Sequence, residues 1–230
     1  MMTGELDGTA EPGRIGERLN EILSSLGETA LEPALAGRFG AYAALLVRWN
    51  ARMNLTAVRD EEGILRRHFV ESIACACHLP SEIASLLDFG SGAGFPGIPI
   101  ALCRGEIAVT LAESQGKKAA FLHEAARVLD LKVRVHGGRA ELMGEHFGCV
   151  TLRAVDRMGD AVRVASGLVA NGGWLALLTT VSDESSIRNW AEGAFEWSPA
   201  VVLPGAAERI LLLGQRPIVP RGTIQPRSEP

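Results

Sequence analysis

Three glycines within five positions follow a short apolar run in the stretch LLDFGSGAGFPGIPIAL, residues 86–102. Gly90, Gly92 and Gly94 predict a tight turn between a strand and a helix, because glycine adopts backbone conformations that other residues avoid. Such a turn brings free backbone N–H groups and a helix N-terminus to one place, where nucleotide-like ligands bind. The motif alone is weak in a chain with 26 glycines, since an ordinary strand-to-helix turn has the same pattern.

An acidic residue, Glu113, ends the next apolar run, VTLAES. About 20 residues beyond a glycine loop, a carboxylate at the end of the second strand can accept hydrogen bonds from the two ribose hydroxyls of an adenosine-containing ligand. A polar residue that merely ends a strand is the structural alternative. The glycine loop and the acid in this order favour adenosine binding.

The glycine spacing bears on which adenosine ligand is bound. Dinucleotide folds prefer G-x-G-x-x-G, whereas here Gly90, Gly92 and Gly94 are followed by Phe95, with Gly97 beyond. G-x-G-x-G with a glutamate after the second strand, and two strands that end the sheet as an edge pair, resembles the S-adenosylmethionine-dependent methyltransferases. No catalytic His or Tyr-Lys pair for hydride transfer stands out, so an NAD-dependent dehydrogenase is the least favoured function.

Helical and strand patterns along the chain indicate how these residues are positioned. Three helical patterns come first, from Arg14, after Pro33 and from Asp60, which is the expected N-cap. Alternating strands and helices follow and predict a mostly parallel sheet covered on both faces. The last two strands, near 196–203 and 208–214, are expected as an antiparallel edge pair. The predicted fold is α/β and Rossmann-like: a mostly parallel seven-stranded sheet with an antiparallel edge strand and an N-terminal helical extension.

Composition divides the chain into four expected segments. Residues 1–13 are expected to be disordered, 14–79 to form the helical extension, 80–216 the methyltransferase domain and 217–230 a loose tail. With 47% apolar and 22% charged residues the chain is typical of soluble globular proteins. No apolar stretch reaches the roughly 20 residues of a membrane span, and the N-terminus lacks a signal-peptide pattern, so a cytoplasmic location is expected.

Charged residues and cysteines limit the possible partners. The formal net charge of −4 excludes a protein that coats nucleic acid through bulk positive charge, so any RNA contact must come from a local patch. One candidate runs from Arg48 to His68, although its mixed charges also fit a solvated helix face. The four cysteines lie within apolar segments and form no C-x-x-C pair, so reduced thiols in the core are expected. The spacing of Cys75, Cys77 and His78 fits a metal site poorly, so no metal is expected.

Six sequence blocks carry a closer resemblance to a known family. In chain order they are RWNARMNLTAVRD, LRRHFVES, DFGSGAGFPGIPIA, ESQGKKAAFL, GRAE and LRAV. From about Leu35 to Arg216 the chain resembles the bacterial 16S ribosomal RNA guanine-N-7 methyltransferase family, called RsmG or GidB. The resemblance implies S-adenosylmethionine as the methyl donor. It also implies a guanine in the decoding-region loop of 16S rRNA as the acceptor, in the 30S ribosomal subunit or an assembly intermediate.

The resemblance also implies which residues hold the cofactor. It places Gly90 and Phe95 at the first loop, and Ala140 and Glu141 of GRAE near the adenine end. Arg153 of LRAV matches a cofactor-site arginine that would bind a carboxylate, orient the guanine or do both, with a strand-end salt bridge as the structural alternative. The full predicted cofactor set is Gly90, Ser91, Gly92, Gly94, Phe95, Glu113, Ser114, Arg139, Ala140, Glu141 and Arg153.

Methylation of a ring nitrogen requires few catalytic groups. Methyl transfer is an in-line displacement, so the enzyme chiefly aligns the nucleophile, the methyl group and the leaving sulfur. Guanine N-7 has a free lone pair and no proton to lose, so no general base is expected and Arg153 would act by positioning. The chain has TLRA where amino-directed enzymes have an Asn/Asp-Pro-Pro-Tyr pattern. Cys149 is expected to be buried, unlike the nucleophilic cysteine of cytosine-C-5 enzymes.

Candidate RNA contacts lie mainly in the helical extension. They are Asn50, Arg52, Asn54, Arg67, His68 and, at the helix after Glu113, Lys117. Two departures from the family concern the acceptor side. The family commonly has Lys-Gly after the fifth strand, where this chain has Thr179 and Thr180, and it tends to have a histidine where this chain has Ile210. The missing lysine is expected to affect rate or RNA affinity more than cofactor binding.

Two other functions stay open from the sequence. The first is a methyltransferase that acts on a small molecule or a protein, which the acidic net charge and the missing lysine favour. The second is a ribosome-assembly factor that binds S-adenosylmethionine without catalysis. Activity on ribosomal and metabolite substrates distinguishes the first from an rRNA enzyme, and cofactor binding without turnover identifies the second.

Overall fold

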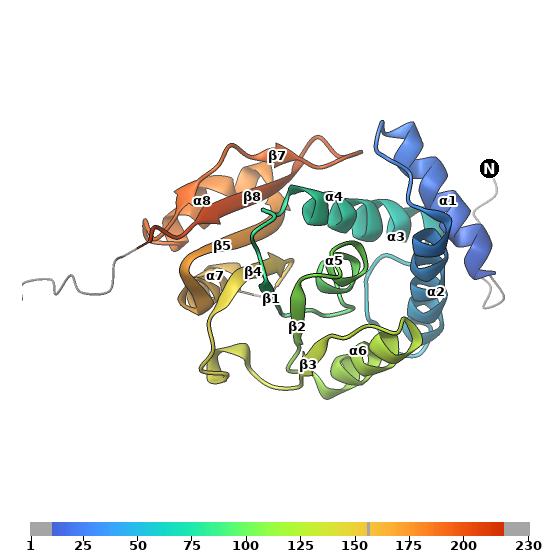
Figure 1. Cartoon of the computed structure of the whole chain (residues 1–230), viewed down its shortest axis with the longest axis horizontal. Coiled ribbons are helices and arrows are strands. Elements are labelled where there is room, and N and C mark those ends of the chain that lie inside the picture. Colours follow the sequence, from blue (N-terminus) through green and yellow to red (C-terminus); the bar gives the residue numbers. More distant parts are fainter. Residues whose placement is uncertain (1–10, 156, 219–230) are drawn as a thin grey trace, which may run out of the picture.

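A computed structural model describes residues 11–155 and 157–218 of the chain, and an eight-stranded sheet lies at its centre (Figure 1). The strand order is β3-β2-β1-β4-β5-β8-β6, and β7 also pairs with β8. The pairs among β1 to β5 are parallel, and β8 is antiparallel to its neighbours. The strands are β1 (Ser85–Phe89), β2 (Ala108–Ala112), β3 (Arg134–His136), β4 (Phe147–Arg153), β5 (Val169–Thr180), β6 (Glu196–Trp197), β7 (Val201–Val202) and β8 (Arg209–Gln215).

The antiparallel edge confirms the expected pairing but not the expected strand count. Where one strand was predicted over 196–203, the chain forms two strands of two residues each, β6 and β7. Pro199 lies between them, and proline has no N–H to donate to a neighbouring strand. Both short strands pair with β8, which therefore lies inside the sheet between β5 and this interrupted edge.

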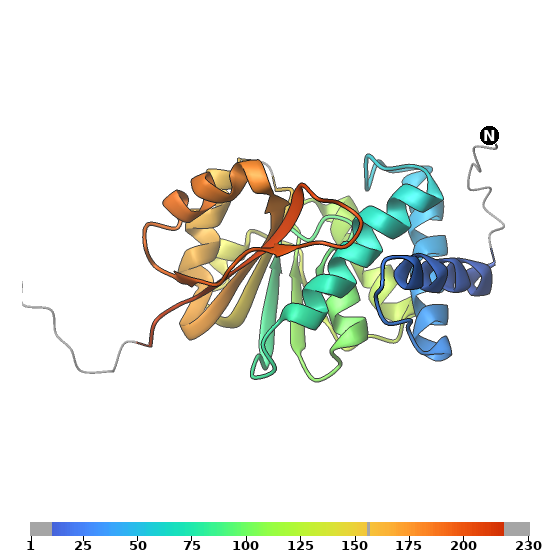
Figure 2. The same cartoon turned by 90° about the horizontal axis from the view of Figure 1, so that it is seen from above.

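Helices cover the two faces of the sheet unequally (Figures 1 and 2). The helical extension packs on one face together with α5 (Gly97–Cys103) and α6 (Gly116–Val128), whereas α7 (Met158–Leu168) and α8 (Glu184–Trp190) pack on the other. Successive residues of a strand point to opposite faces. Accordingly Leu86 and Leu87, neighbours in β1, belong to two separate hydrophobic clusters.

The helical extension consists of α1 (Pro12–Ser25), α2 (Pro33–Asn50) and a third, longer helical stretch. This stretch comprises α3 (Glu61–Ile64), a π-helical turn η1 (Leu65–Val70) and α4 (Glu71–His78). Asp60 is the N-cap as predicted, because its side chain accepts a hydrogen bond from the backbone N–H of Gly63 at 2.7 Å. The π-helical turn was not predicted.

The ends of the chain fall largely outside the described residues. Helix α1 begins at Pro12, inside the segment 1–13 that was expected to be disordered. Proline is favoured in the first turn of a helix, which explains this start. The rest of that prediction, over residues 1–10, lies outside the described part of the chain, as does the predicted tail over residues 219–230. Among the described residues, no helix is long and apolar enough to cross a membrane.

Aromatic side chains join the extension to the sheet. Tyr42 of α2 is fully buried, stacks on Phe69 with 5.2 Å between ring centroids, and lies 5.2 Å from the ring of Phe95. Its hydroxyl donates to the carbonyl of Ala93 in the glycine-rich loop. One hydrophobic cluster therefore contains residues of both the extension and the expected methyltransferase domain, so the extension shares its core with the sheet.

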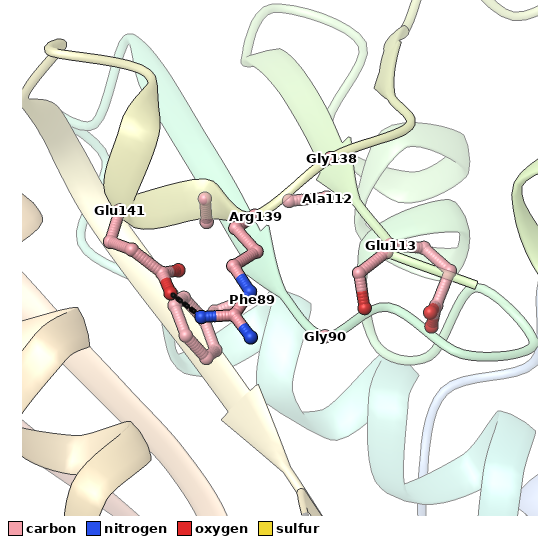
Figure 3. Close-up of a pocket in the computed structure, with 9 residues that line it drawn as sticks. Phe89, Gly90, Ala112, Glu113, Gly138, Arg139 and Glu141 are labelled. Carbon is pink, nitrogen blue, oxygen red and sulfur yellow. Dashed lines mark ion pairs between the residues drawn. The ribbon is translucent and has the colours of Figure 1, made fainter. Parts of the chain in front are cut away.

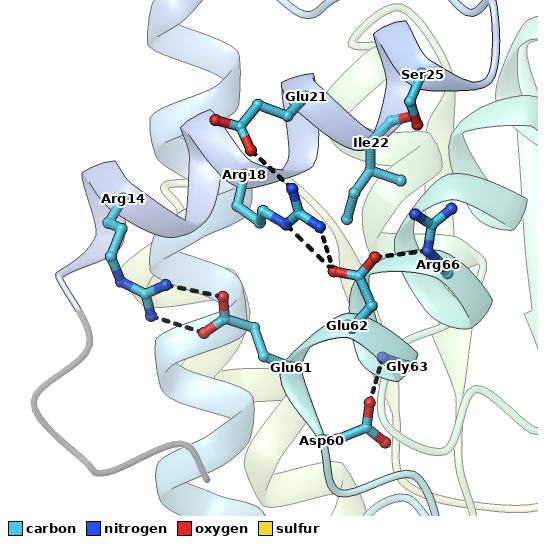
Figure 4. A network of polar contacts seen from close by, with 10 residues as sticks. All are labelled: Arg14, Arg18, Glu21, Ile22, Ser25, Asp60, Glu61, Glu62, Gly63 and Arg66. Carbon is cyan, nitrogen blue, oxygen red and sulfur yellow. Dashed lines mark hydrogen bonds and ion pairs between the residues drawn. The ribbon is translucent and has the colours of Figure 1, made fainter. Parts of the chain in front are cut away.

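Ion pairs between α1 and α3 tie the first helix to the third helical stretch (Figure 4). Arg14 contacts Glu61 at 2.7 Å, and Glu62 accepts from both Arg18 at 2.9 Å and Arg66 at 2.7 Å. Two acidic residues of the Arg48–His68 patch, Glu61 and Glu62, are thus paired with arginines, and a third, Asp60, caps a helix. This pairing reduces the repulsion that free carboxylates would exert on an RNA phosphate.

Candidate functional site

A cleft of about 210 Å³ opens where β1 and β2 end and the chain passes from β3 into the short helix η2 (Ala140–Leu142). Six residues of the predicted cofactor set line it, and Figure 3 shows Glu113 on one side with Arg139 and Glu141 on the other. Phe89, Ala112 and Gly138 also line the cleft and were missed, although each lies directly beside a predicted residue. The lining residues are Phe89, Gly90, Ala112, Glu113, Ser114, Gly138, Arg139, Ala140 and Glu141.

The Glu113 carboxylate is held by the backbone around it. Oε2 accepts from the N–H of Gly92 at 3.0 Å, and Oε1 accepts from the N–H of Gln115 at 2.7 Å. The residue is only 6% exposed. Each carboxylate oxygen has two lone pairs, so each can accept one further hydrogen bond from a ligand hydroxyl. The carboxylate is therefore fixed in place and can still bind a ligand.

The opposite wall of the cleft comes from the loop after β3. Arg139 and Glu141 form an ion pair at 3.7 Å in which the Arg139 side chain is 75% exposed. Exposed pairs of this kind contribute little to stability, so both side chains are free to rearrange around a ligand. Ala140 between them is buried against α7 and its neighbours and anchors the wall.

The glycine-rich loop meets the cleft at one glycine and the helical extension at another. Gly90, at φ +70°, is exposed and lines the cleft. A Cβ on Gly94, at φ +90°, would instead lie 2.5 Å from Ile98 Cδ1 and 2.7 Å from the hydroxyl of Tyr42. The bare backbone at Gly94 therefore accommodates the protein's own α2 and α5, which the local sequence pattern did not reveal.

Three other predicted cofactor residues of this loop do not line the cleft. Ser91 is buried, and its hydroxyl donates to the carbonyl of Asp88 at 3.0 Å. Phe95 is 7% exposed and packs among the aromatic rings of the extension. Gly92 stays outside the lining but holds Glu113 through its N–H. The loop turns beneath α2, and this turn directs the side chains of Ser91 and Phe95 into the protein.

Arg153, at the end of β4, forms the strand-end salt bridge that was the structural alternative. Its Nη2 donates to Glu71 Oε2 at 3.0 Å and to the carbonyl of Arg67. The side chain is 6% exposed, and burial lowers the pKa of Arg153 to about 10. Arg153 does not line the cleft, and its Nη1 is buried without a hydrogen-bond partner among residues 11–155 and 157–218.

Asn50, a predicted RNA contact, instead binds the backbone of the turn that follows α2. The residue is 7% exposed, and its Oδ1 accepts from the backbone N–H groups of Leu55 at 2.8 Å and Thr56 at 3.0 Å. The amide satisfies two donors of the turn that follows α2, and a side chain so placed is poorly exposed to an RNA strand. The sequence pattern placed Asn50 at a helix end but carried no signal of this turn.

His68, also a predicted RNA contact, packs inward beside the glycine-rich loop. Its ring stacks on Phe95 with 4.8 Å between centroids, and Nε2 lies 2.7 Å from Thr56 Oγ1. Burial, reinforced by the charges of Arg153 and Arg67, lowers the pKa of His68 to about 3. The imidazole is therefore neutral at physiological pH and offers no charge to a phosphate.

The other predicted RNA residues are accessible. Arg52, Arg67 and Lys117 have exposed side chains, and Asn54 is exposed but accepts a hydrogen bond from Arg59 at 2.8 Å. Arg67 lies next to Arg153, because its backbone carbonyl accepts from the Arg153 guanidinium. These four side chains are available for contacts with a large polyanion.

The cysteines and the positions that depart from the family differ in burial. Cys149 is buried, as predicted, and burial raises the pKa of its thiol, which excludes a thiolate nucleophile there. Cys77 is exposed, contrary to the expectation of a core thiol. Thr179 and Ile210 are cross-strand partners of β5 and β8 and are both buried. In the described part of the chain, no three His, Cys, Asp or Glu residues cluster closely enough to hold a metal ion.

Comparison with known proteins identifies the family. Residues 36–196 match the model of the GidB family, described as rRNA small subunit methyltransferase G. The chain belongs to the GidB family. It is 39% identical over 196 residues to the ribosomal RNA small subunit methyltransferase G of Stenotrophomonas maltophilia (strain R551-3), a match that covers 84% of this chain and 89% of that protein.

Other relatives agree with membership in the GidB family. A protein of the same name from Roseiflexus sp. (strain RS-1) is 50% identical over 125 residues, which cover 51% of this chain and 53% of that protein. Among solved structures, an S-adenosylmethionine-dependent methyltransferase from Aquifex aeolicus aligns with a TM-score of 0.54 at 14% identity, over 67% of this chain and 93% of that one. The structural likeness confirms the methyltransferase fold.

Proposed function

We propose that this chain transfers the methyl group of S-adenosylmethionine to N-7 of a guanine in the decoding-region loop of 16S rRNA. Membership in the GidB family supports both the reaction and the rRNA substrate. The observation that carries the proposal is the Glu113 carboxylate at the end of β2, held by the N–H of Gly92 and facing the loop of Ala140 and Glu141 across the cleft. The 30S subunit or an assembly intermediate is the proposed particle.

The cleft suits the nucleoside part of the cofactor. Its volume of about 210 Å³ is below the roughly 300–1,000 Å³ of sites that enclose a drug-sized ligand, so it fits one portion of a larger molecule. Glu113 would accept hydrogen bonds from the ribose hydroxyls, and the wall at Ala140 and Glu141 would border the adenine. Gly90, which has no side chain, would let the rest of the molecule pass along the loop toward the end of β4.

The chemistry places modest demands on the residues of this chain. S-adenosylmethionine, when bound, supplies a methyl group on a positively charged sulfur. Guanine N-7 attacks with a lone pair that carries no proton, so the protein needs no general base and acts by alignment. Arg153 is the proposed positioning residue at the end of β4. One nitrogen of its fixed guanidinium has no hydrogen-bond partner within the described ranges and can hold a carboxylate or a base oxygen.

The acceptor RNA is proposed to approach from the side of the helical extension. Arg52, Asn54, Arg67 and Lys117 are exposed and can contact phosphates, which position an RNA strand without reading its sequence. Arg67 is the anchor of this proposal, because its backbone touches Arg153 while its side chain faces solvent. Binding through a few such cations should weaken as salt concentration rises.

One labelling experiment tests the proposed function. The purified chain is incubated with S-adenosylmethionine carrying a labelled methyl group and with 30S subunits or naked rRNA from a strain that lacks this modification. Nucleoside analysis is expected to find the label in 7-methylguanosine at one decoding-region position. Labelling of another nucleoside, or of a metabolite or protein but not rRNA, would overturn the proposal, and cofactor binding without any turnover would favour a non-catalytic assembly factor.

A further inference from the structure

Three charged side chains from distant parts of the chain meet beside the glycine-rich loop. Glu71 opens α4, Arg153 ends β4 and Arg209 opens β8. Glu71 Oε2 accepts from Arg153 Nη2 at 3.0 Å and from Arg209 Nη2 at 3.1 Å, and Arg209 Nε lies 3.4 Å from Oε1. The exposed fractions of the three side chains are 2% for Glu71, 6% for Arg153 and 18% for Arg209.

The charges in this cluster do not balance. Glu71 carries one negative charge for the two guanidinium groups of Arg153 and Arg209, so one positive charge is left over. His68 beside them adds none, because its imidazole is neutral. Two further charges act on Arg153, a positive one from Arg67 and a negative one from Asp88, and these two cancel. A buried excess of positive charge favours an anionic ligand.

One guanidinium nitrogen of Arg153, Nη1, has no hydrogen-bond partner among the residues that the structure describes. Nη2 is engaged twice, by Glu71 and by the carbonyl of Arg67 in the π-helical turn, and such turns frequently occur at functional sites. Nη1 is buried and has no hydrogen-bond partner in the described part of the chain. Because the guanidinium is planar, two contacts on Nη2 fix the direction of the N–H groups on Nη1.

We propose that Glu71 and Arg209 are positioning residues that hold Arg153 ready to bind the carboxylate of the cofactor's amino-acid end. Glu71 fixes the guanidinium plane, and Arg209 shares the same carboxylate so that Arg153 keeps a net attraction for an anion. This inference rests on the proposed function, since it takes S-adenosylmethionine as the ligand. Arg209 lies beyond residues 36–196, which match the family model, and contacts Glu71 from the start of β8.

Two ligands distinguish a positioning role from a merely structural one. S-adenosylhomocysteine carries the amino-acid carboxylate, whereas 5′-methylthioadenosine has the same nucleoside without it. Isothermal titration calorimetry on the full chain is expected to show that Glu71→Gln weakens S-adenosylhomocysteine binding about ten-fold and leaves methylthioadenosine binding unchanged. Glu62→Gln is the matched control, since it removes a carboxylate that is also shared by two arginines but lies in α3, and it should change neither affinity.

A second variant keeps the proposal falsifiable if Glu71→Gln does not fold. Arg209→Gln should weaken S-adenosylhomocysteine binding several-fold without affecting methylthioadenosine, and Arg209→Lys, which keeps the charge, should restore much of the loss. An equal loss for both ligands, or no loss for either, would overturn the positioning role. If the unaltered chain binds neither ligand, the proposed function itself fails, and the two failures are thus distinguishable.

Discussion

Replacing Glu113 with glutamine tests the cleft most directly. The substitution keeps the size of the side chain but exchanges one carboxylate oxygen for an NH₂ group, which cannot accept a hydrogen bond. In the structure both oxygens accept, one from the N–H of Gly92 at 3.0 Å and one from the N–H of Gln115 at 2.7 Å. One of these donors would face another donor in the variant, and one ribose hydroxyl would lose its charged acceptor.

The expected magnitude follows from these hydrogen bonds. A hydrogen bond to a charged acceptor contributes about 1.5–3 kcal/mol, which corresponds to a rise in Kd of roughly 10- to 150-fold for S-adenosylhomocysteine. The unpaired backbone donor adds a loss of about 1–3 kcal/mol in the free energy of unfolding, because Glu113 is nearly inaccessible to water. Ligand affinity and stability should therefore both decrease, and neither change requires RNA.

Calorimetry with S-adenosylhomocysteine, together with urea unfolding, measures the two effects of Glu113→Gln. Glu145→Gln is the matched control, because Glu145 pairs with Arg134 at 2.7 Å on the surface and does not line the cleft. The control should leave the Kd unchanged. A Kd for Glu113→Gln within about two-fold of the unaltered chain would refute the assignment of Glu113 to ligand binding, since it is smaller than the loss of even one neutral hydrogen bond.

Three further substitutions test other parts of the site. Gly92→Asp should abolish S-adenosylhomocysteine binding in calorimetry, because the added charge would lie beside Glu113. The fold should survive, because a Cβ at Gly92 would lie 3.9 Å from the carbonyl oxygen of Gly90, and Asp and Asn tolerate a φ of +56° better than other side chains do. Retained affinity, or an equal loss in Gly92→Asn, would contradict this. Folding lowers the pKa of His68 from 6.5 to about 3, so acidification protonates this side chain in the unfolded chain before it does so in the folded one. The free energy of unfolding should therefore fall by about 2 kcal/mol between pH 6.5 and about pH 5. Urea unfolding of His68→Asn should not show this loss. If the variant and the unaltered chain lose stability equally over this pH range, His68 is not the cause. Asn50→Ala should lower the free energy of unfolding by about 2 kcal/mol without changing cofactor affinity, whereas unchanged stability with a raised KM for RNA would restore Asn50 as an RNA contact.

Features encoded by neighbouring residues could be predicted from the sequence. The order of apolar runs, glycines and the acid at Glu113 predicted the strand, the loop and the edge of the sheet where the cleft lies, because each depends on backbone preferences over a few residues. The N-cap at Asp60 followed from the same local logic, since the capped N–H lies three residues away. The interruption of the edge strand could also have been predicted from Pro199, because a proline has no backbone N–H to donate to a neighbouring strand.

Contacts between distant residues were decided by the tertiary structure. The partner of Arg153 lies 82 residues earlier at Glu71, and the second arginine on that carboxylate lies 138 residues after Glu71. A spacing pattern cannot select such partners, because they depend on how α4, β4 and β8 pack. The same packing places Tyr42 against Gly94, so a glycine that looked like a ligand contact instead makes room for a helix. The sequence determined at which edge of the sheet the cleft lies, and the packing of the extension decided which side chains can reach it.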